Sequence, residues 1–285
     1  MVWKRFTALA ASAAALLLPV SASAQSSPAA APLSLTRLDC GTVRVNQLNA
    51  FSDTLAYTGQ SRDLSVGCYL IRHGDTLMLW DFGLPLSQKN AVLSREGVMS
   101  SSMKRTMAEQ LADLGIKPAD IDYVALSHYH FDHIGQVAEF PTAKLLIGKQ
   151  DWDVLTSPDK PASVDAVPFA PWIKGGAPVE PVSGDKDIFG DGRVVMLNMP
   201  GHTPGHHALL VRLAETGPVL LTGDQAHFQE NYDSNGVPGF NTDRADTLAS
   251  FDRFKALAKN LGATVIIQHE PRDIAKLPPF PKGAQ

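Results

Sequence analysis

Apolar and polar residues alternate along the early part of the chain, a pattern that predicts β-strands. Val43 and Val45 alternate with polar residues within a run from residue 35 to residue 48, as expected of a strand with one buried face. The apolar runs 66–71 and 77–80 flank His73-Gly74-Asp75. Because such residues favour tight turns, we predict a β-hairpin with these three residues at its turn.

Helical spacing appears in two places. In residues 101–114 and 244–261, apolar residues recur every three or four positions and form one apolar face. The first set is Met103, Met107, Leu111 and Leu114, and the second is Leu248, Phe251, Phe254, Leu257 and Leu261. Strand-like runs at 193–198, 207–213 and 219–222 give the chain a second strand-rich half. Two such halves, each carrying helices, predict an α+β chain folded as a four-layer αββα sandwich.

The composition is that of an ordinary globular chain, and it limits the partners. Of the 285 residues, 44% are hydrophobic and 19% are charged, so residues 34–285 can form a single domain with a large core. The net charge is -4 and no basic run occurs. We therefore expect no nucleic-acid partner and no electrostatic attraction to an anionic membrane.

The first 24 residues have the pattern of a secretory signal peptide. Lys4 and Arg5 precede the apolar run 8–18, and Pro19 with the small residues 21–24 provides a cleavage site. A membrane anchor is the alternative, but the run is shorter than the roughly 20 residues that a spanning helix needs. We expect a periplasmic or secreted protein without a stable membrane anchor, beginning with a flexible lead over residues 25–33.

Export bears on the two cysteines, Cys40 and Cys68, which fall in the first two predicted strand regions. An oxidising compartment permits a disulfide between them. Two small buried apolar side chains are the alternative, and the sequence leaves this choice open.

The strongest chemical signal is Ser127-His128-Tyr129-His130-Phe131-Asp132-His133, directly after the apolar run 123–126. His128 and His130 leave an extended segment on the same side and can hold one ion, while Asp132 and His133 face a second ion. A purely structural cluster is the alternative. Imidazole nitrogens and a carboxylate packed this closely favour a zinc site.

Further candidate ligands lie downstream, each just beyond a predicted strand. His202 lies in a Pro- and Gly-rich turn at 199–206, Asp224 follows the run 219–221, and His269 follows the run 264–267. If these strand ends share one edge of the sandwich, the three side chains converge on the histidine motif.

This motif set resembles that of the metallo-β-lactamase superfamily of binuclear hydrolases, and within it most closely that of the N-acyl homoserine lactonases. The resemblance is carried by residues 38–42, 130–133, 200–206 and 238–240. It implies a metallo-β-lactamase-type sandwich with two zinc ions per chain. His128, His130 and His202 would hold the first ion, Asp132, His133 and His269 the second, and Asp224 would bridge them. His206 would be a structural hydrogen-bonding residue, and His207 a strand residue.

Two zinc ions roughly 3.5–4 Å apart can share a bridging water and present it as hydroxide at neutral pH. We expect this hydroxide to open a small-molecule lactone or ester, and the resemblance points to N-acyl homoserine lactones, the reaction called quorum quenching. An Asp at position 224 favours a lactone or ester over a β-lactam, because the β-lactam-hydrolysing branches of the superfamily usually carry Cys or Ser there. Asp132 would also carry a proton to the leaving group.

One position departs from the best-known homoserine lactonases, which carry a Tyr three residues after the bridging Asp. In this chain the residue is His227. An imidazole can also donate a hydrogen bond to the substrate oxygen, so we predict a catalytic or substrate-contacting role. A supporting or surface histidine is the alternative.

Two segments are candidates for the walls of an apolar substrate pocket. Leu55 and Tyr57 in residues 51–64 would meet an acyl chain, and the long loop 157–178 would form a lid or wall, with plain surface packing as its alternative.

Two acidic residues have open roles. Asp81 either supports the site or ends a strand, and Glu270 either orients His269 or caps the following turn.

Several alternatives to the main hypothesis stay open. A β-lactamase or an organophosphate triesterase would use the same fold, and a non-enzymatic zinc-binding protein would use the same ligands. Cobalt, manganese or iron could occupy these groups in place of zinc. The sequence does not set the oligomeric state, and a homodimer is compatible with it.

Overall fold

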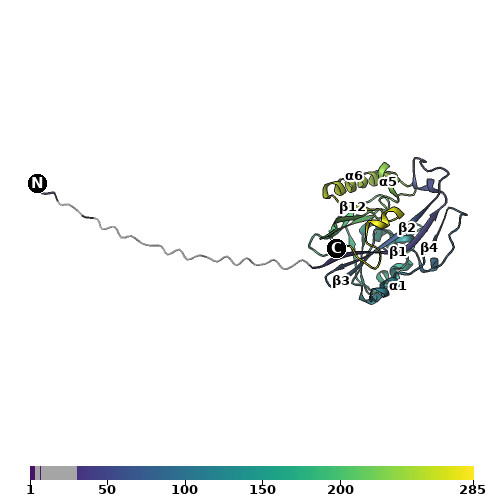
Figure 1. Cartoon of the computed structure of the whole chain (residues 1–285), viewed down its shortest axis with the longest axis horizontal. Helices are drawn as coiled ribbons and strands as arrows, with labels where there is room; N and C mark the ends of the chain where they lie inside the picture. The colour runs from purple at the N-terminus through teal and green to yellow at the C-terminus, as the bar shows by residue number, and fades with distance from the viewer. Residues whose placement is uncertain (4–6, 8–30) are drawn as a thin grey trace. The chain divides into compact units, whose positions relative to one another are not determined.

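Two β-sheets organise residues 33–285 in this computed structural model, which describes residues 1–3, 7 and 31–285 (Figure 1). Most of the predicted signal peptide and most of the predicted lead therefore lie outside the described residues. Residues 31–285 form one compact unit. No helix within the described ranges combines the length and the apolar character that a membrane crossing requires.

The first sheet has seven strands in the order β4-β1-β2-β3-β5-β6-β7. They are β1 (Leu33–Val45), β2 (Arg62–His73), β3 (Thr76–Trp80), β4 (Met99–Ser102), β5 (Tyr123–Ala125), β6 (Lys144–Gly148) and β7 (Val179–Val182). Strands β3, β5, β6 and β7 run parallel, whereas the pairs that β1 forms with β2 and β4 are antiparallel. The predicted hairpin joins β2 to β3, and Gly74 supplies the left-handed backbone at its turn, with φ 60°.

The second sheet has five strands in the order β12-β11-β10-β9-β8. They are β8 (Lys186–Asp187), β9 (Val194–Asn198), β10 (His207–Leu213), β11 (Gly217–Leu221) and β12 (Thr264–Ile266). The residue bounds of β9, β10 and β11 nearly coincide with those of the three strand-like runs predicted in this half of the chain. Because β11 and β12 are parallel, both end at the same edge of the sheet.

Helices cover the outer faces of the two stacked sheets. They are α1 (Met107–Asp113), α2 (Phe131–Ile134), α3 (Lys149–Thr156), α4 (Ala170–Ile173), α5 (Gln229–Ser234) and α6 (Arg244–Leu261). Trp80 from the first sheet and Leu209 and Val211 from the second belong to one apolar cluster between the sheets. Figure 1 shows α1 and α6 on opposite sides of the pair of sheets. The predicted α+β sandwich is confirmed.

Helix α6 spans the predicted residues because local sequence fixes both of its ends. The side chain of Asp243 accepts a hydrogen bond from the backbone nitrogen of Asp246, which caps the first turn. Gly262 ends the helix in the left-handed conformation, with φ 59°. Phe254 of α6 then packs against Leu210 of the second sheet.

The prediction of a helix over residues 101–114 is wrong for its first six residues. Helix α1 begins after Thr106, which forms a capping box with Glu109. Ser101 and Ser102 belong instead to β4, where they pair with β1. Met103 is nevertheless buried. The apolar spacing therefore indicated a buried side chain correctly, but it did not mark a continuous helix.

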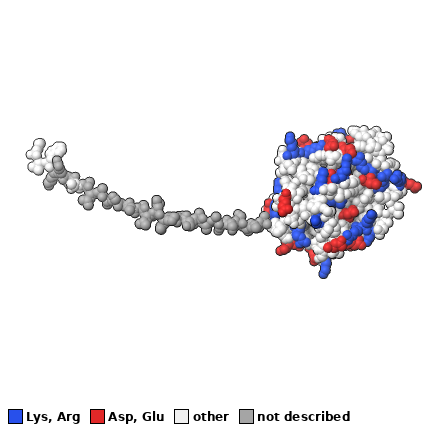
Figure 2. Space-filling model, viewed as in Figure 1, with Lys and Arg blue, Asp and Glu red and all other residues white. Residues whose placement is uncertain are grey.

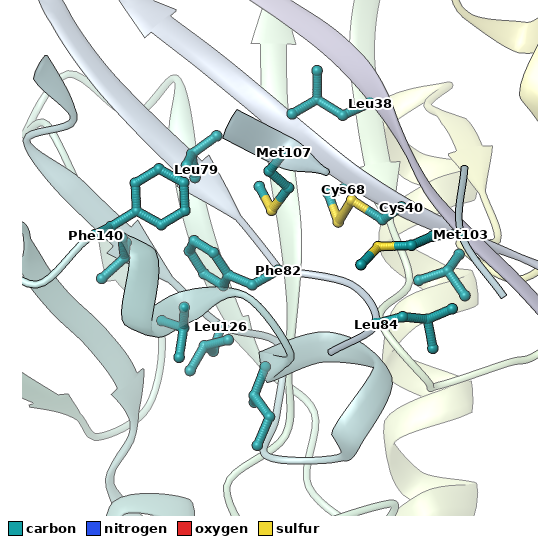
Figure 3. Packing of buried hydrophobic residues seen from close by; sticks show 14 of the residues in the cluster. Leu38, Cys40, Cys68, Leu79, Phe82, Leu84, Met103, Met107, Leu126 and Phe140 are labelled. Carbon is teal, nitrogen blue, oxygen red and sulfur yellow. A yellow bond between two sulfur atoms is a disulfide. The ribbon is translucent and has the colours of Figure 1, made fainter. Parts of the chain in front are cut away.

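Cys40 of β1 and Cys68 of β2 form a disulfide, which settles the choice that the sequence left open. Figure 3 shows this bond inside the apolar cluster that covers the outer face of the first sheet, close to Met107 of α1. The two longest strands of the sheet are therefore linked covalently inside the core.

Charged side chains of both signs are interspersed over the face of the molecule shown in Figure 2. The surface ion pairs of the chain include Lys144 with Glu180 and Arg44 with Asp63. Because water screens such exposed pairs, each contributes only about 0–1 kcal/mol. The stability of the fold therefore rests mainly on the apolar clusters.

Candidate metal centre

Loops that follow strands bring the predicted ligands together at one edge of the sandwich. The segment from β5 into α2 carries the histidine motif, and the loop from β9 to β10 carries His202. Asp224 follows β11, and His269 follows β12. All seven predicted side chains fall into two groups whose ligand atoms lie within 4.8 Å of one another in each group.

The first group contains His128, His130, His202 and Asp224. Nε2 of His202 lies 2.9 Å from Nδ1 of His130 and 3.2 Å from Nε2 of His128. The same nitrogen atoms of His128 and His130 are 3.0 Å apart. Three ring nitrogens therefore converge on one point.

The second group contains Asp132, His133 and His269. The Nε2 atoms of His133 and His269 are 3.1 Å apart, and Oδ2 of Asp132 lies 3.6 Å from Nε2 of His269. Asp132 and His133 are consecutive residues of the short helix α2. The helix thus presents a carboxylate and an imidazole to the same place.

Asp224 lies between the two groups. Its Oδ2 is 3.2 Å from Nε2 of His202, in the first group. Its Oδ1 is 3.1 and 3.0 Å from the Nε2 atoms of His133 and His269, in the second group. Although Oδ1 is buried, no described residue satisfies it with a hydrogen bond.

Hydrogen bonds on the far side of the rings fix which nitrogen points inward. Nδ1 of His269 faces the carbonyl oxygen of Ser65 at 2.8 Å, and Nδ1 of His133 faces Oδ2 of Asp81 at 2.9 Å. Both partners only accept, so each Nδ1 carries the proton. Because a neutral imidazole has one N–H, each Nε2 presents a lone pair to the centre.

The same argument applies to His202. Its Nδ1 lies 2.8 Å from Oδ1 of Asn241, whose amide nitrogen donates to Oγ1 of Thr247. Thr247 itself donates to the carbonyl oxygen of Asp243, so the orientation of the amide is fixed. The Nε2 lone pair of His202 therefore also points inward.

Burial and neighbouring charges shift the pKa values of the imidazoles in different directions. Burial lowers the pKa of His128 and His130 well below the usual value, and neighbouring imidazoles act in the same direction. Burial also acts to lower the pKa of His133, but the carboxylates of Asp224 and Asp81 outweigh it and raise that pKa well above the usual value. Converging lone pairs around a buried carboxylate with an unsatisfied oxygen fit two cations held by nitrogen and oxygen ligands.

Asp81 supports the centre, which resolves its open role. It is fully buried with a left-handed backbone, φ 58°, directly after β3. Its carboxylate accepts hydrogen bonds from the backbone nitrogen and hydroxyl of Ser127, at 2.7 and 2.9 Å, and from Nε2 of Gln268 at 2.8 Å. It therefore holds His133 while being held by its neighbours.

The remaining polar residues next to the ligands have structural roles. Nδ1 of His206 donates to the carbonyl oxygen of Met199, and its Nε2 accepts from the backbone nitrogen of Asp224. His207 is the first residue of β10. The side chain of Glu270 caps the 3-10 helix Pro271–Lys276, so its open role is resolved in favour of capping.

A cavity of about 270 Å³ opens beside the two ligand groups. Asp132, His130, Asp224 and His269 reach it from the centre. Its other lining residues are Val43, Phe51, Leu64, Met99, Phe131, Ser163, His227 and Phe240. None of the described lining residues is Lys or Arg, and apart from Ser163 the lining away from the centre is apolar.

The predicted pocket walls need correction. Leu55 is 67% exposed, and the hydroxyl of Tyr57 accepts a hydrogen bond from the buried Asn231, so neither residue lines the pocket. Phe51 and Leu64, at the two ends of the same segment, line it instead.

The prediction that the loop 157–178 forms a lid or wall of the pocket also needs correction. Phe169 and Trp172 pack in the main core, which neither the lid nor the surface-packing alternative predicted. Ser163 alone among its residues lines the pocket. Met99 and Val43 could not be found from the sequence, because no motif marks them and only the pairing of β4 with β1 brings them to the pocket.

His227 lies at the centre, in contact with Asp224. Its Nε2 is 3.0 Å from Oδ2 of Asp224, and its ring packs edge-on against Phe51 and Phe240. Burial lowers the pKa of His227 to about 4, although Asp224 acts to raise it. The ring is therefore neutral at neutral pH.

Comparison with protein families identifies the class of protein. The family described as the metallo-beta-lactamase superfamily matches residues 62–269, well over half of the chain. The chain belongs to this superfamily.

Curated relatives include the N-acyl homoserine lactonase AttM of Azorhizobium caulinodans, which is 36% identical over 177 residues. The match covers 57% of this chain and 63% of AttM, so this chain spans less than two thirds of that relative.

Two solved structures show the same fold. An N-acyl homoserine lactone hydrolase, with the product N-hexanoyl-L-homoserine at its catalytic metal centre, matches with a TM-score of 0.75 at 24% identity, over 89% of this chain and 99% of that one. AidC, a dizinc quorum-quenching lactonase, matches with a TM-score of 0.64 at 18% identity, over 85% of this chain and 89% of AidC.

Asp151 of α3 is a buried carboxyl group that the sequence did not reveal. It accepts hydrogen bonds from the hydroxyl of Thr203 at 2.8 Å and from the backbone nitrogen of Gly205 at 2.6 Å. It thereby fixes the loop that carries His202. Burial raises the pKa of Asp151 to about 7, although these two hydrogen bonds act in the opposite direction.

This shift predicts a pH dependence of stability. Because the pKa of Asp151 is higher in the folded than in the unfolded chain, its contribution to the free energy of unfolding is greatest below the unfolded pKa of about 4 and falls as the pH rises to about 7. Between these pH values Asp151 should make the wild-type free energy of unfolding fall by up to about 1.4 kcal/mol per pH unit. The Asp151→Asn substitution should remove this fall. Urea denaturation at several pH values measures the slopes, and parallel profiles for the two proteins would contradict the prediction.

Proposed function

We propose that this chain is a binuclear metal hydrolase that opens the ring of N-acyl homoserine lactones. The observation that carries the proposal is the position of Asp224, whose two carboxylate oxygens face two separate groups of ligand side chains beside an apolar pocket. The similarity to AttM supports this choice of substrate, and so does the product bound in the structural relative.

These groups would hold two divalent cations, which would supply an activated water and positive charge for the carbonyl oxygen. We assign His128, His130 and His202 to one cation, Asp132, His133 and His269 to the other, and Asp224 to both. Nitrogen and carboxylate donors suit zinc, and the dizinc description of AidC supports that identity.

The pocket residues would bind and orient the substrate. Val43, Leu64 and Met99 offer apolar surface to an acyl chain, whereas Asp132 lies where the pocket meets the centre. The side chain of Asp132 keeps 13% of its surface exposed. We infer that it carries a proton to the leaving oxygen as the ring opens.

His227 would act as a catalytic residue next to the reacting carbonyl. It is neutral, lines the pocket, and directs Nε2 towards Oδ2 of Asp224. A proton held on this ring lies beside the centre, where the substrate oxygen must bind.

We also infer that the protein is exported. The charged, apolar and small residues within residues 1–24 support this, and the disulfide between Cys40 and Cys68 supports an oxidising compartment.

Removal of metal should abolish lactone opening, because the proposal requires both cations. A chelator and the Asp224→Ala substitution should each lower kcat/KM for a long-chain acyl homoserine lactone by about a hundredfold or more, and zinc should restore only the chelated wild-type protein. Asp153→Ala, at an exposed ion pair, is the matched control. Comparison with a carbapenem and paraoxon tests the substrate, since faster turnover of either would overturn the lactone assignment.

Substitution of His227 separates a donor role from a packing role. His227→Phe keeps an aromatic ring but removes the proton, so kcat/KM should fall by about a hundredfold. His227→Tyr restores a donor and should stay within about tenfold of wild type. Equal activity of the Phe and Tyr variants, measured by lactone titration at fixed pH, would exclude the donor role.

Export predicts a shortened chain. Protein recovered from the periplasm or the medium should begin near Gln25, because the small residues before it form the cleavage site. Intact-mass measurement tests this, and a chain that retains residues 1–24 would contradict it.

A further inference from the structure

Gln268 occupies a junction that neither the motif set nor the proposed reaction explains. It lies between the end of β12 and the ligand His269, and it is 1% exposed. Its Oε1 accepts from Nε1 of Trp80 at 3.1 Å and from the backbone nitrogen of Gly223 at 3.0 Å. Its Nε2 donates to Oδ2 of Asp81 at 2.8 Å and to the carbonyl oxygen of Gly67 at 3.2 Å.

The chemistry of these partners fixes the orientation of the carboxamide. An indole nitrogen and a backbone N–H can only donate, so they select the oxygen of Gln268. A carbonyl and a carboxylate can only accept, so they select its nitrogen. All four hydrogen-bonding positions of the side chain are therefore used, and a flipped amide would oppose every partner.

These partners join the two sheets where the ligands emerge. Trp80 ends β3 and Gly67 lies in β2, both in the first sheet, whereas Gly223 follows β11 in the second. Gln268 itself follows β12. A single side chain thus connects four segments of the chain at one edge of the sandwich.

Two of these partners, Asp81 and Gly223, and Gln268 itself are each one step from a proposed ligand. Asp81 holds Nδ1 of His133 at 2.9 Å. Gly223 immediately precedes Asp224, and Gln268 immediately precedes His269. The hydrogen bonds of the carboxamide therefore help to fix the positions of three ligands. His133 and His269 belong to the second group, and Asp224 is shared by both groups.

We propose that Gln268 is a positioning residue that sets the metal affinity of the centre by holding Asp81 and Gly223 in fixed relation. This inference rests on the proposed function, since it requires the centre to bind metal. Its role differs from that of an ordinary buried hydrogen-bonding residue, because its loss should change metal binding more than it changes folding.

Two substitutions remove different parts of the junction. Gln268→Met keeps the approximate volume but leaves the partners on both sheets unsatisfied. Gln268→Glu keeps an acceptor for Trp80 and Gly223 but turns a carboxylate oxygen towards Oδ2 of Asp81. Like charges at that distance repel, so Asp81 should shift away and release His133.

Gln110 provides a matched control. It is 3% exposed and bonds to both the backbone nitrogen and the carbonyl oxygen of Asp39, each at 2.9 Å. Its third partner is the carbonyl oxygen of Thr106. Neither partner is a proposed ligand or holds one, so Gln110→Met removes a buried carboxamide away from the centre.

The experiment is a zinc titration of the metal-free full chain against a chelating indicator, with urea denaturation of the same metal-free samples and the absorption spectrum of the cobalt-loaded protein. Wild type should bind two zinc ions. In Gln268→Met and Gln268→Glu at least one ion should bind about 10–100-fold more weakly, with a changed cobalt spectrum. Gln110→Met should lose stability but keep both affinities and the wild-type spectrum.

The outcomes separate the two hypotheses. Wild-type affinities and spectrum in the Gln268 variants, or equal losses of affinity in Gln110→Met, would overturn the role of Gln268 and leave the proposed function intact. A wild-type chain that bound no zinc would instead overturn the proposed function itself. Gln268→Asn, which keeps the carboxamide on a shorter side chain, should weaken zinc binding in the same direction and serves if the Met variant does not fold.

Discussion

The buried carboxylate of Asp224 is the interaction on which the rest of the centre depends. Its side chain is 5% exposed, and a negative charge in such a place is costly unless positive charge or hydrogen-bond donors surround it. His133, His202 and His269 each place Nε2 within 3.2 Å of its oxygens. Since the outer partners of these rings direct lone pairs inward, the compensating charge must come from cations, or from extra protons when cations are absent. The pKa values of His133 and His269 are raised because the buried carboxylate of Asp224 favours their protonated forms.

Glycine residues allow the segments around the centre to approach one another more closely than residues with a side chain would permit. Gly223 has φ 54°, and a Cβ there would lie 2.6 Å from Nε2 of His206. A Cβ on Gly148 would lie 1.9 Å from the carbonyl oxygen of Gly205. Gly223 next to Asp224 and Gly148, which lies against the His202 loop, are therefore steric requirements of the centre. The parallel ends of β11 and β12 then bring Asp224 and His269 to the same edge.

The sequence predicted those parts of the structure that local signals determine. The histidine motif, the strand ends before His202, Asp224 and His269, and the capped helix α6 each carry their pattern within a few residues. The pocket walls and the supporting network do not. Met99 reaches the pocket only because β4 pairs with β1, and Gln268 acquires its partners only when two sheets stack. Tyr57 was misplaced for the same reason, since its partner Asn231 lies 174 residues away.

The charge of the pocket limits the substrates that fit the proposed reaction. Away from the centre its described lining is apolar apart from Ser163, and it includes carboxylates at the centre but neither Lys nor Arg. A substrate with a second anionic group would have to bury that charge without a protein cation beside it, which is unfavourable. A neutral acyl chain meets no such penalty and gains up to about 0.8 kcal/mol for each methylene that it buries. Binding energy would then come from the chain, while the centre acts on the ring carbonyl. This division suits a neutral lactone better than an anionic β-lactam.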